Sequence, residues 1–234
     1  MSDWKQKRFW TEAKAVEVDG GFSVQLDGRG VKTPAKAALT LPSYEMAAAI
    51  AAEWDAQVDG INPETMPFTR SANAAIDKVA NQHSEVAEML ADYGDSDLLC
   101  YRADSPKELV QRQAEQWDAP LIWAGEVFGA RLETRQGLQH SGQDPVALAT
   151  LREAVHAQSN FQLAAFHDLV SMSGSLILGF ATAQNWRSAD EIWRISRLDE
   201  TWQEEQWGVD DEAQETAELK RTAFLHAKSF YDIS

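Results

Sequence analysis

The chain has 234 residues and a mass of 26.0 kDa, which is long enough for one large domain or two small ones with a sizeable core. It is 44% hydrophobic and 25% charged, close to the globular average, and this composition excludes a disordered chain. Its 37 acidic residues against 21 basic ones give a formal charge of -16, a field that repels nucleic-acid backbones and anionic lipid surfaces.

Cysteine usage and hydropathy limit the remaining classes of protein. The single cysteine, Cys100, excludes an intrachain disulfide and a multi-cysteine metal or iron-sulfur site, and it predicts a reducing compartment. The first ten residues include basic side chains with no apolar run behind them, so they lack the layout of a secretory signal, and the mature protein is expected to begin there. Polar residues interrupt the most apolar stretch, 161–181, which is therefore predicted to be a buried helix and not a membrane span.

The first forty residues have the pattern of a small β-meander. Strand-like residues 15–18 and 22–26 flank Asp19-Gly20-Gly21, and apolar residues alternate through the second segment. This pattern predicts a hairpin, followed by further short strands. Ser43 is then expected to cap a helix that runs over residues 46–57.

Helical periodicity dominates from residue 69 onward. Two strand-like breaks, residues 98–101 and 130–134, are expected to pair with each other. Capping boxes begin at Ser105 and Ser188, and Asp144 stands before a proline suited to a first helical turn. At least five helices are predicted after Ser105, and the chain as a whole is predicted to be α+β.

The residues that could carry enzyme chemistry form no recognisable site. No glycine-rich phosphate loop is present, and the polar residues between His156 and His167 are predicted to break the helix that would bring these two imidazoles together. Cys100 lies in an apolar segment, where a buried and inert thiol is expected. Acidic pairs such as Asp95 and Asp97 are plentiful, but sequence neighbours do not identify a catalytic pair across a cleft. No cofactor, metal or catalytic residue is therefore predicted.

One segment is both acidic and rich in tryptophan. Nine acidic residues and no basic one lie between Leu198 and Leu219. Two interpretations stay open: a solvated helix face, or a protein-binding surface, since tryptophan is enriched in binding hot spots. Four tryptophans, two of them in this run and two shortly before it, could equally anchor the helical core: Trp186, Trp193, Trp202 and Trp207. The residues alone indicate a binding module without visible enzyme chemistry.

Seven short strings occur in an order that resembles a known family. They are Lys7-Arg8-Phe9-Trp10, Leu26-Asp27-Gly28-Arg29 with Lys32-Thr33-Pro34, Glu53-Trp54-Asp55-Ala56-Gln57, Asp97-Leu98-Leu99-Cys100-Tyr101-Arg102, Gln116-Trp117-Asp118, Ser196-Arg197-Leu198-Asp199-Glu200 and Gln206-Trp207-Gly208. Together they resemble the assembly chaperone of the F-type ATP synthase that handles the alpha subunit of the soluble catalytic head. The resemblance runs from Arg8 to about Phe230.

The resemblance implies a two-domain protein without enzymatic activity. We expect a β-rich N-terminal domain with one helix over residues 1–68, and a larger orthogonal α-helical bundle over residues 69–234. Family members hold the newly made alpha subunit and keep its interface for the beta subunit from aggregating until the ring is assembled. This chain is expected to do the same and to be a monomer when free.

The resemblance also assigns individual residues. The functionally sensitive acidic position of the family falls on Asp199, with Glu200 beside it, and the family's sensitive tryptophan falls on Trp54, which is expected to be structural. The partner-binding residues predicted in the acidic run are Asp199, Glu200, Trp202, Trp207, Asp210 and Glu212.

Mitochondrial members carry an import segment ahead of the Arg-Phe string, whereas seven residues stand there in this chain, so a bacterial cytoplasmic protein is expected. Two other functions stay open. One is a general holdase or adaptor that uses the same surface for several clients, and the other is a hydrolase built on unrecognised carboxylates.

Overall fold

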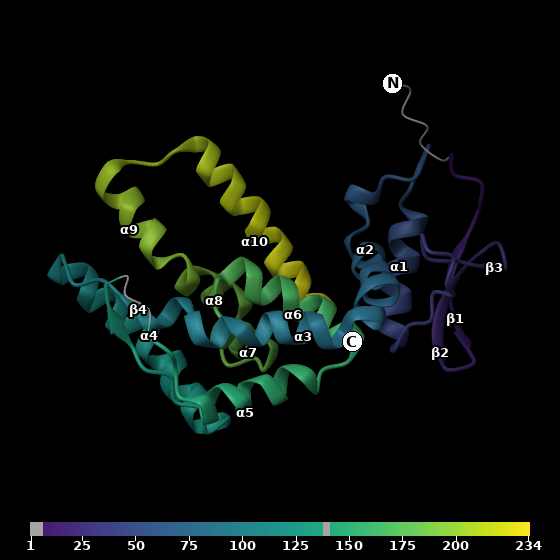
Figure 1. Cartoon of the computed structure of the whole chain (residues 1–234). Helices are drawn as coiled ribbons and strands as arrows, with labels where there is room; N and C mark the ends of the chain where they lie inside the picture. Colours follow the sequence, from purple (N-terminus) through teal and green to yellow (C-terminus); the bar gives the residue numbers. More distant parts are fainter. Residues whose placement is uncertain (1–6, 138–140) are drawn as a thin grey trace. The chain divides into compact units, whose positions relative to one another are not determined.

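The structure is a computed structural model that describes residues 7–137 and 141–234 (Figure 1). A small antiparallel sheet comes first in the chain and a larger helical region follows, so the predicted α+β class is confirmed. The strands are β1 (Ala13–Val18), β2 (Gly21–Leu26), β3 (Arg29–Gly30), β4 (Tyr101–Arg102) and β5 (Arg135–Gln136). The α-helices are α1 (Tyr44–Asp55), α2 (Pro67–Ala74), α3 (Ala80–Ala91), α4 (Lys107–Val127), α5 (Pro145–His156), α6 (Asn160–Ser173), α7 (Leu176–Ala183), α8 (Ala189–Ser196), α9 (Leu198–Trp207) and α10 (Asp211–Asp232).

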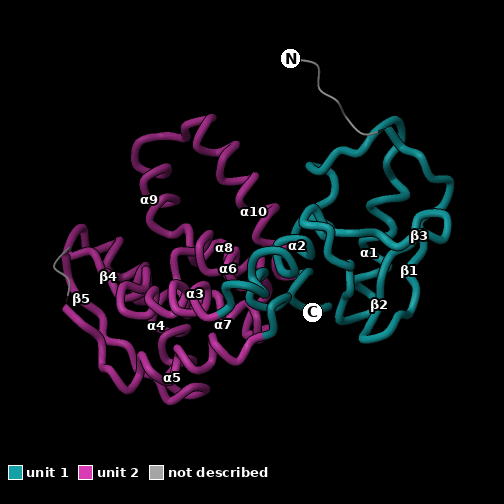
Figure 2. Tube along the Cα trace, turned by 45° about the vertical axis from the view of Figure 1, so that its right-hand side comes forward, with its two compact units in different colours: residues 1–83, 159–165, 229–234 teal, residues 84–158, 166–228 magenta. Residues whose placement is uncertain are grey.

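The residues cluster into two compact units (Figure 2). Unit 1 comprises residues 1–83, 159–165 and 229–234, and unit 2 comprises residues 84–158 and 166–228. Each unit therefore takes residues from separate parts of the chain. The division of the chain into two continuous domains after residue 68 stays a prediction.

The sheet of unit 1 confirms the predicted hairpin. β1 pairs antiparallel with β2, from Ala13 opposite Leu26 to Val18 opposite Gly21, and β3 extends the sheet on the other side of β2. Gly21 has a φ of +150°, and a Cβ there would overlap the carbonyl oxygen of Leu41. Position 21 therefore requires glycine, because the backbone of Leu41 passes close to the start of β2.

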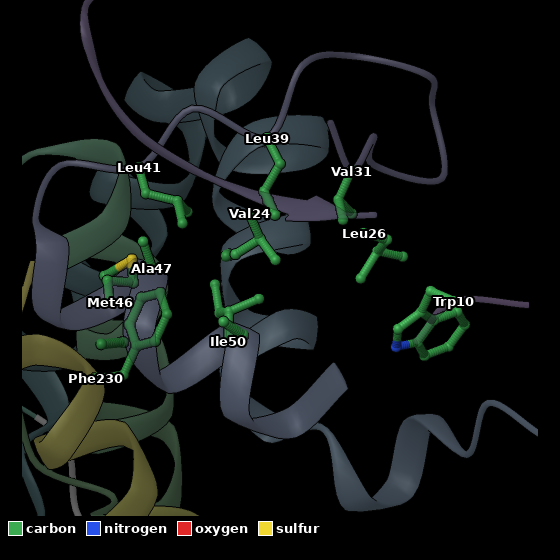
Figure 3. Packing of buried hydrophobic residues seen from close by; sticks show 13 residues of the cluster. Trp10, Val24, Leu26, Val31, Leu39, Leu41, Met46, Ala47, Ile50 and Phe230 are labelled. Atoms are coloured by element: carbon green, nitrogen blue, oxygen red, sulfur yellow. The ribbon is translucent and has the colours of Figure 1, made fainter. Parts of the chain in front are cut away.

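The core of unit 1 lies between the sheet and α1. Figure 3 shows Val24 of β2 and Ile50 of α1 pointing toward each other, with Phe230 beside Met46. All four side chains are buried and belong to one apolar cluster. Ser43 caps α1 by accepting the backbone N–H of Met46 at 3.2 Å, so the predicted cap is confirmed, although the helix begins at Tyr44 and ends at Asp55.

The predicted helix starts of unit 2 have mixed outcomes. Ser188 and Glu191 form a complete capping box on α8, and the Asp144 side chain caps α5, so both predictions are confirmed. The capping box predicted at Ser105 is wrong. Pro106 occupies the N-cap of α4 without a side-chain cap, and the Ser105 hydroxyl donates instead to the neighbouring Asp104 carboxylate at 3.1 Å.

The strands predicted at residues 98–101 and 130–134 are also wrong in their bounds. Residues Leu98–Cys100 form a 3₁₀ turn because Asp97 caps it, accepting the N–H of Leu99 at 3.0 Å. The extended pairing begins at Tyr101, the last residue of the first predicted segment, and lies just beyond the second, where β4 pairs in parallel with β5. The two regions of the chain do meet, through two residues each.

The single buried helix predicted over residues 161–181 is two helices. Gly174 adopts a left-handed φ of +70° after α6, and the Ser175 hydroxyl caps α7 by accepting the N–H of Leu178. Gly179 allows the two helices to approach closely, since a Cβ there would lie 2.6 Å from a Val170 methyl carbon. Among the described residues, no helix is long and apolar enough to cross a membrane.

Candidate functional site

The acidic, tryptophan-bearing run forms α9 and the first half of α10, together with the loop between them (Figure 1). At the end of α9, Trp207 is 80% exposed, and Val209 in the loop is 57% exposed. Exposed acidic residues surround them, including Asp210 and Glu212. The run thus presents apolar side chains within a negatively charged surface.

Two acidic residues of α9 face α4 of the same unit. Asp199 is half-buried, and its carboxylate accepts a hydrogen bond from the Gln113 amide at 2.7 Å. Glu205 accepts from Arg112 at 2.8 and 2.9 Å, and this hydrogen bond lowers the pKa of the Glu205 carboxyl. The Arg112 guanidinium also lies 4.9 Å from the centre of the Trp202 ring, within cation-π range. Asp199 and Trp202 therefore contribute to packing within the unit.

Three other predicted site residues line one shallow cavity between the start of α9 and the start of α10. Glu200, Asp210 and Glu212 share this cavity of about 480 Å³ with the cations Arg197 and Lys220. Arg197 donates to Glu200 at 2.7 Å, whereas Asp210 caps α10 by accepting the N–H of Glu212 at 2.9 Å. The cavity is thus lined by both signs of charge, and two of its acids already have partners within the chain.

The four clustered tryptophans divide between core and surface. Trp193 is buried against Phe224, with ring centroids 5.5 Å apart, and Trp186 packs half-buried against Trp123 at 6.0 Å. Trp202 is half-buried beneath Arg112. Trp207 alone of the four is exposed. The four tryptophans are therefore neither all core anchors nor all part of an exposed binding surface, because their positions on the helices face different surroundings.

Trp54 belongs to unit 1, at the end of α1. Its ring lies edge-to-face with that of Trp10, with centroids 5.2 Å apart, and it is half-buried against the core cluster. Within residues 7–137 and 141–234, its buried indole N–H has no hydrogen-bond partner. Arg8 secures the same helix end by donating to the carbonyl oxygens of Asp55 and Gln57 at 2.6 and 2.5 Å. The structural role predicted for Trp54 stays a prediction that these contacts favour.

Other chemistry-bearing residues have ordinary surroundings. Cys100 is buried, as predicted, and desolvation raises the pKa of its thiol to about 12, so it holds its proton at neutral pH. His156 ends α5 and His167 lies in α6, which confirms the predicted break between them. Over the described part of the chain, no group of three or more His, Cys, Asp or Glu side chains could hold a metal ion.

Sequence reasoning missed Gln113 and Arg112 of α4. Gln113 is 2% exposed and shares a helical stripe of buried side chains with Trp117, Leu121 and Ala124. A glutamine on an otherwise apolar stripe is a signal that a buried polar partner exists, because buried amides are hydrogen-bonded. That signal was readable from the spacing, whereas the identity of the partner on α9 required the fold.

Comparisons with known proteins agree with this architecture. Residues 7–125 match the model of the family described as the ATP12 chaperone protein. The chain is 26% identical over 223 residues to the mitochondrial atp12 protein of Schizosaccharomyces pombe, which covers 89% of this chain and 76% of that protein. A crystal structure of Atp12 from Paracoccus denitrificans is 44% identical, with a TM-score of 0.96 and 99% of both chains covered.

Two further structures give the same result. An aspartate-to-lysine mutant of the Paracoccus protein has the same identity, coverage and TM-score. A protein of Agrobacterium tumefaciens is 39% identical with a TM-score of 0.92, covering 97% of this chain and 85% of that one. Because the family match spans half of the sequence and the solved relatives match nearly all of it, this chain belongs to the ATP12 chaperone family, the assembly chaperones of ATP synthase.

Proposed function

We propose that this protein binds the unassembled alpha subunit of the ATP synthase catalytic head, shields its subunit interface and promotes assembly of the head. It does so by binding alone, without catalysing a reaction, and as a monomer when free. Its place is the bacterial cytoplasm, which the close match to proteins of Paracoccus and Agrobacterium supports. Family membership supports the role in assembly, and the sequence strings support the alpha subunit as client.

The observation that carries the proposal is the exposure of Trp207 within an acidic surface. A ring subunit outside its ring exposes apolar interface that would otherwise be buried, and large apolar patches in water aggregate. A chaperone that binds this interface needs an exposed apolar surface of its own, and charged residues around that surface keep the chaperone soluble. Trp207, Val209 and the acids Asp210 and Glu212 provide such a contact.

Charge complementarity then defines the client surface. The chain carries a net charge of -16, and the acid-only run concentrates negative charge around Trp207. Complementary potentials speed association and reject wrong partners. The client surface that fits is an apolar patch with basic residues at its rim.

The test is direct mixing with purified alpha subunit. We expect one complex on size exclusion at micromolar concentration, suppression of alpha-subunit aggregation measured by light scattering, and no ATP hydrolysis by the chaperone alone. Trp207→Ala should weaken capture, while Ile122→Ala, which also truncates an exposed apolar side chain but lies on α4 outside the acidic run, serves as the matched control. Separate peaks without suppression of aggregation would overturn the proposal, and equal protection of many unrelated clients would identify a general holdase instead.

A further inference from the structure

We propose that Gln113 is a positioning residue for the client-binding surface, and that Asp199 acts as its hydrogen-bond acceptor on α9 and not as a charge presented to the client. The buried amide of Gln113 joins the chain at Ala103 to the first turn of α9. The orientation of α9, and with it the exposure of Trp207 at the other end, depends on this link. The identity of the client comes from the proposed function, whereas the positioning role of Gln113 does not depend on it.

The geometry fixes the direction of every hydrogen bond in the link. The Gln113 oxygen accepts the backbone N–H of Ala103 at 2.8 Å, so the amide nitrogen is the atom that faces α9. That nitrogen can only donate, and the Asp199 carboxylate accepts from it at 2.7 Å. Turning the amide over would set its nitrogen against the N–H of Ala103. Position 199 therefore needs an acceptor.

Gln113 lies in a row of three contacts along α4. One turn further along the helix, the buried indole N–H of Trp117 donates to the carbonyl oxygen of Ile195 at 2.9 Å. On the other side of Gln113, Arg112 pairs with Glu205. The row thus secures the end of α8, the first turn of α9 and the last turn of α9 to the same helix. Gln113 and Asp199 form its partly buried central contact.

Through this row of contacts Asp199 influences the surface around Trp207 without being part of that surface. Asp199 lies in the first turn of α9 and Trp207 is its last residue, eight residues and about 12 Å away along the axis. A lysine at position 199 would set a donor against the Gln113 amide, and α9 would have to move away from α4. An asparagine would keep an acceptor oxygen and leave the helix in place.

The first experiment measures α9 directly by hydrogen exchange of its amides in the free protein. Asp199→Asn should leave exchange within about twofold of wild type, whereas Asp199→Lys and Gln113→Glu should speed it about tenfold or more, because a buried hydrogen bond is replaced by two donors or by two acceptors. Glu85→Lys, an exposed charge reversal on α3, is the control for net charge. Equal exchange in Asp199→Lys and wild type would overturn the positioning role.

A reversed pair gives the sharper test. Combining Gln113→Glu with Asp199→Asn puts the acceptor on α4 and the donor on α9, while the Ala103 N–H keeps an oxygen partner. The double variant should recover slow exchange, which a general loss of packing would not predict. Failure of the double variant to improve on Gln113→Glu would contradict the link.

The second experiment measures capture of purified alpha subunit by the same variants. Asp199→Asn and the double variant should bind like wild type, and Asp199→Lys should bind at least about tenfold more weakly. Loss of binding in Asp199→Asn with unchanged α9 exchange would show a charge contact with the client and overturn the inference. If wild type itself does not bind the alpha subunit, the proposed client is wrong, and the exchange experiment still decides the role of Gln113.

Discussion

In each unit a carboxylate accepts the N–H groups at the start of a helix that follows later in the chain, and the two carboxylates differ in burial. In unit 1, Glu53 of α1 accepts the N–H groups of Phe68 and Thr69 at 2.6 and 2.8 Å, at the start of α2. In unit 2, Asp97 accepts the N–H of Ile177 at 3.0 Å in the first turn of α7, and the Ser175 hydroxyl at 2.7 Å. Glu53 is partly accessible, whereas Asp97 is fully buried.

The difference shows how burial competes with hydrogen bonding for the same group. Desolvation raises the pKa of both carboxyls, and hydrogen bonds from helix N–H groups oppose that rise in both. At Asp97, full burial raises the pKa to about 6. The same capping chemistry therefore stabilises a surface helix start in unit 1 and holds a charge within the core of unit 2 at neutral pH.

The largest expected effect comes from removing the buried cap. Asp97→Ala leaves the N–H groups of Leu99 and Ile177 and the Ser175 hydroxyl without their acceptor, and each buried donor left unpaired costs about 1–3 kcal/mol. We expect the free energy of unfolding, measured by urea denaturation, to fall by about 4 kcal/mol. Asp92→Ala, at a side chain 69% exposed, should change it by less than about 0.5 kcal/mol. Similar losses in the two variants would contradict the difference in burial.

The pH dependence of unit 2 tests the cause of the shift. Because the pKa of Asp97 is raised from 3.8 to about 6 in the fold, the folded state favours the proton, and stability from this group is lost as pH rises through that range. Relative to Asp97→Asn, wild type should lose about 3 kcal/mol between about pH 4 and pH 7, measured by exchange of α7 amides. A wild type that gains stability over this range would show that hydrogen bonding outweighs burial.

Trp54 tests unit 1 at the end of the helix that carries Glu53. Trp54→Arg removes the edge-to-face contact with Trp10 and places a second guanidinium near that of Arg8. We expect a loss of about 2 kcal/mol in the free energy of unfolding, because a charge replaces a half-buried ring. Trp54→Phe, which keeps an aromatic ring, should lose less. A Trp54→Arg protein that unfolds like wild type but fails to bind the alpha subunit would show that residue 54 contacts the client.

Local pattern predicted the parts of the fold that local interactions determine. The hairpin, the Ser43 cap and the Ser188 box depend on residues within a few positions of each other, and all were readable in sequence. The family resemblance identified the assembly role that the comparisons confirm. The acidic run was visible in the sequence, but it forms two helices joined by a loop, and Asp199 and Trp202 within it are half-buried.

Two of the errors arose where partners distant in sequence decide the structure. Residues 98–100 are apolar enough for a strand, but Asp97 binds donors near residue 176 and turns the chain instead. In the charge pattern Asp199 is one acid among nine, and although the family resemblance singled it out, neither predicted the amide 86 residues earlier that donates to it. Charge and periodicity gave no means of separating an acid that faces a neighbouring helix from one that faces solvent.

The smallest expected effect is at Glu53, the partly accessible carboxylate of the two. Glu53→Gln keeps one acceptor oxygen for the N–H of Phe68, but its new amide group faces the N–H of Thr69. The Thr69 hydroxyl, which donates to Glu53 at 2.7 Å, can rotate and accept from that amide. One donor is thus left to water at a partly accessible site, and we expect a loss of about 1 kcal/mol in the free energy of unfolding, measured by urea denaturation.

Asp97→Asn makes the same exchange of carboxylate for amide where water cannot reach, so above the pKa of Asp97 the relief of a buried charge opposes the loss of an acceptor. Because burial raises the pKa of both carboxyls, the cost of each variant should shrink as pH rises, and the larger shift at the fully buried Asp97, to about 6, should give the larger change with pH. Parallel pH profiles for the two variants would mean that burial does not distinguish the two carboxylates.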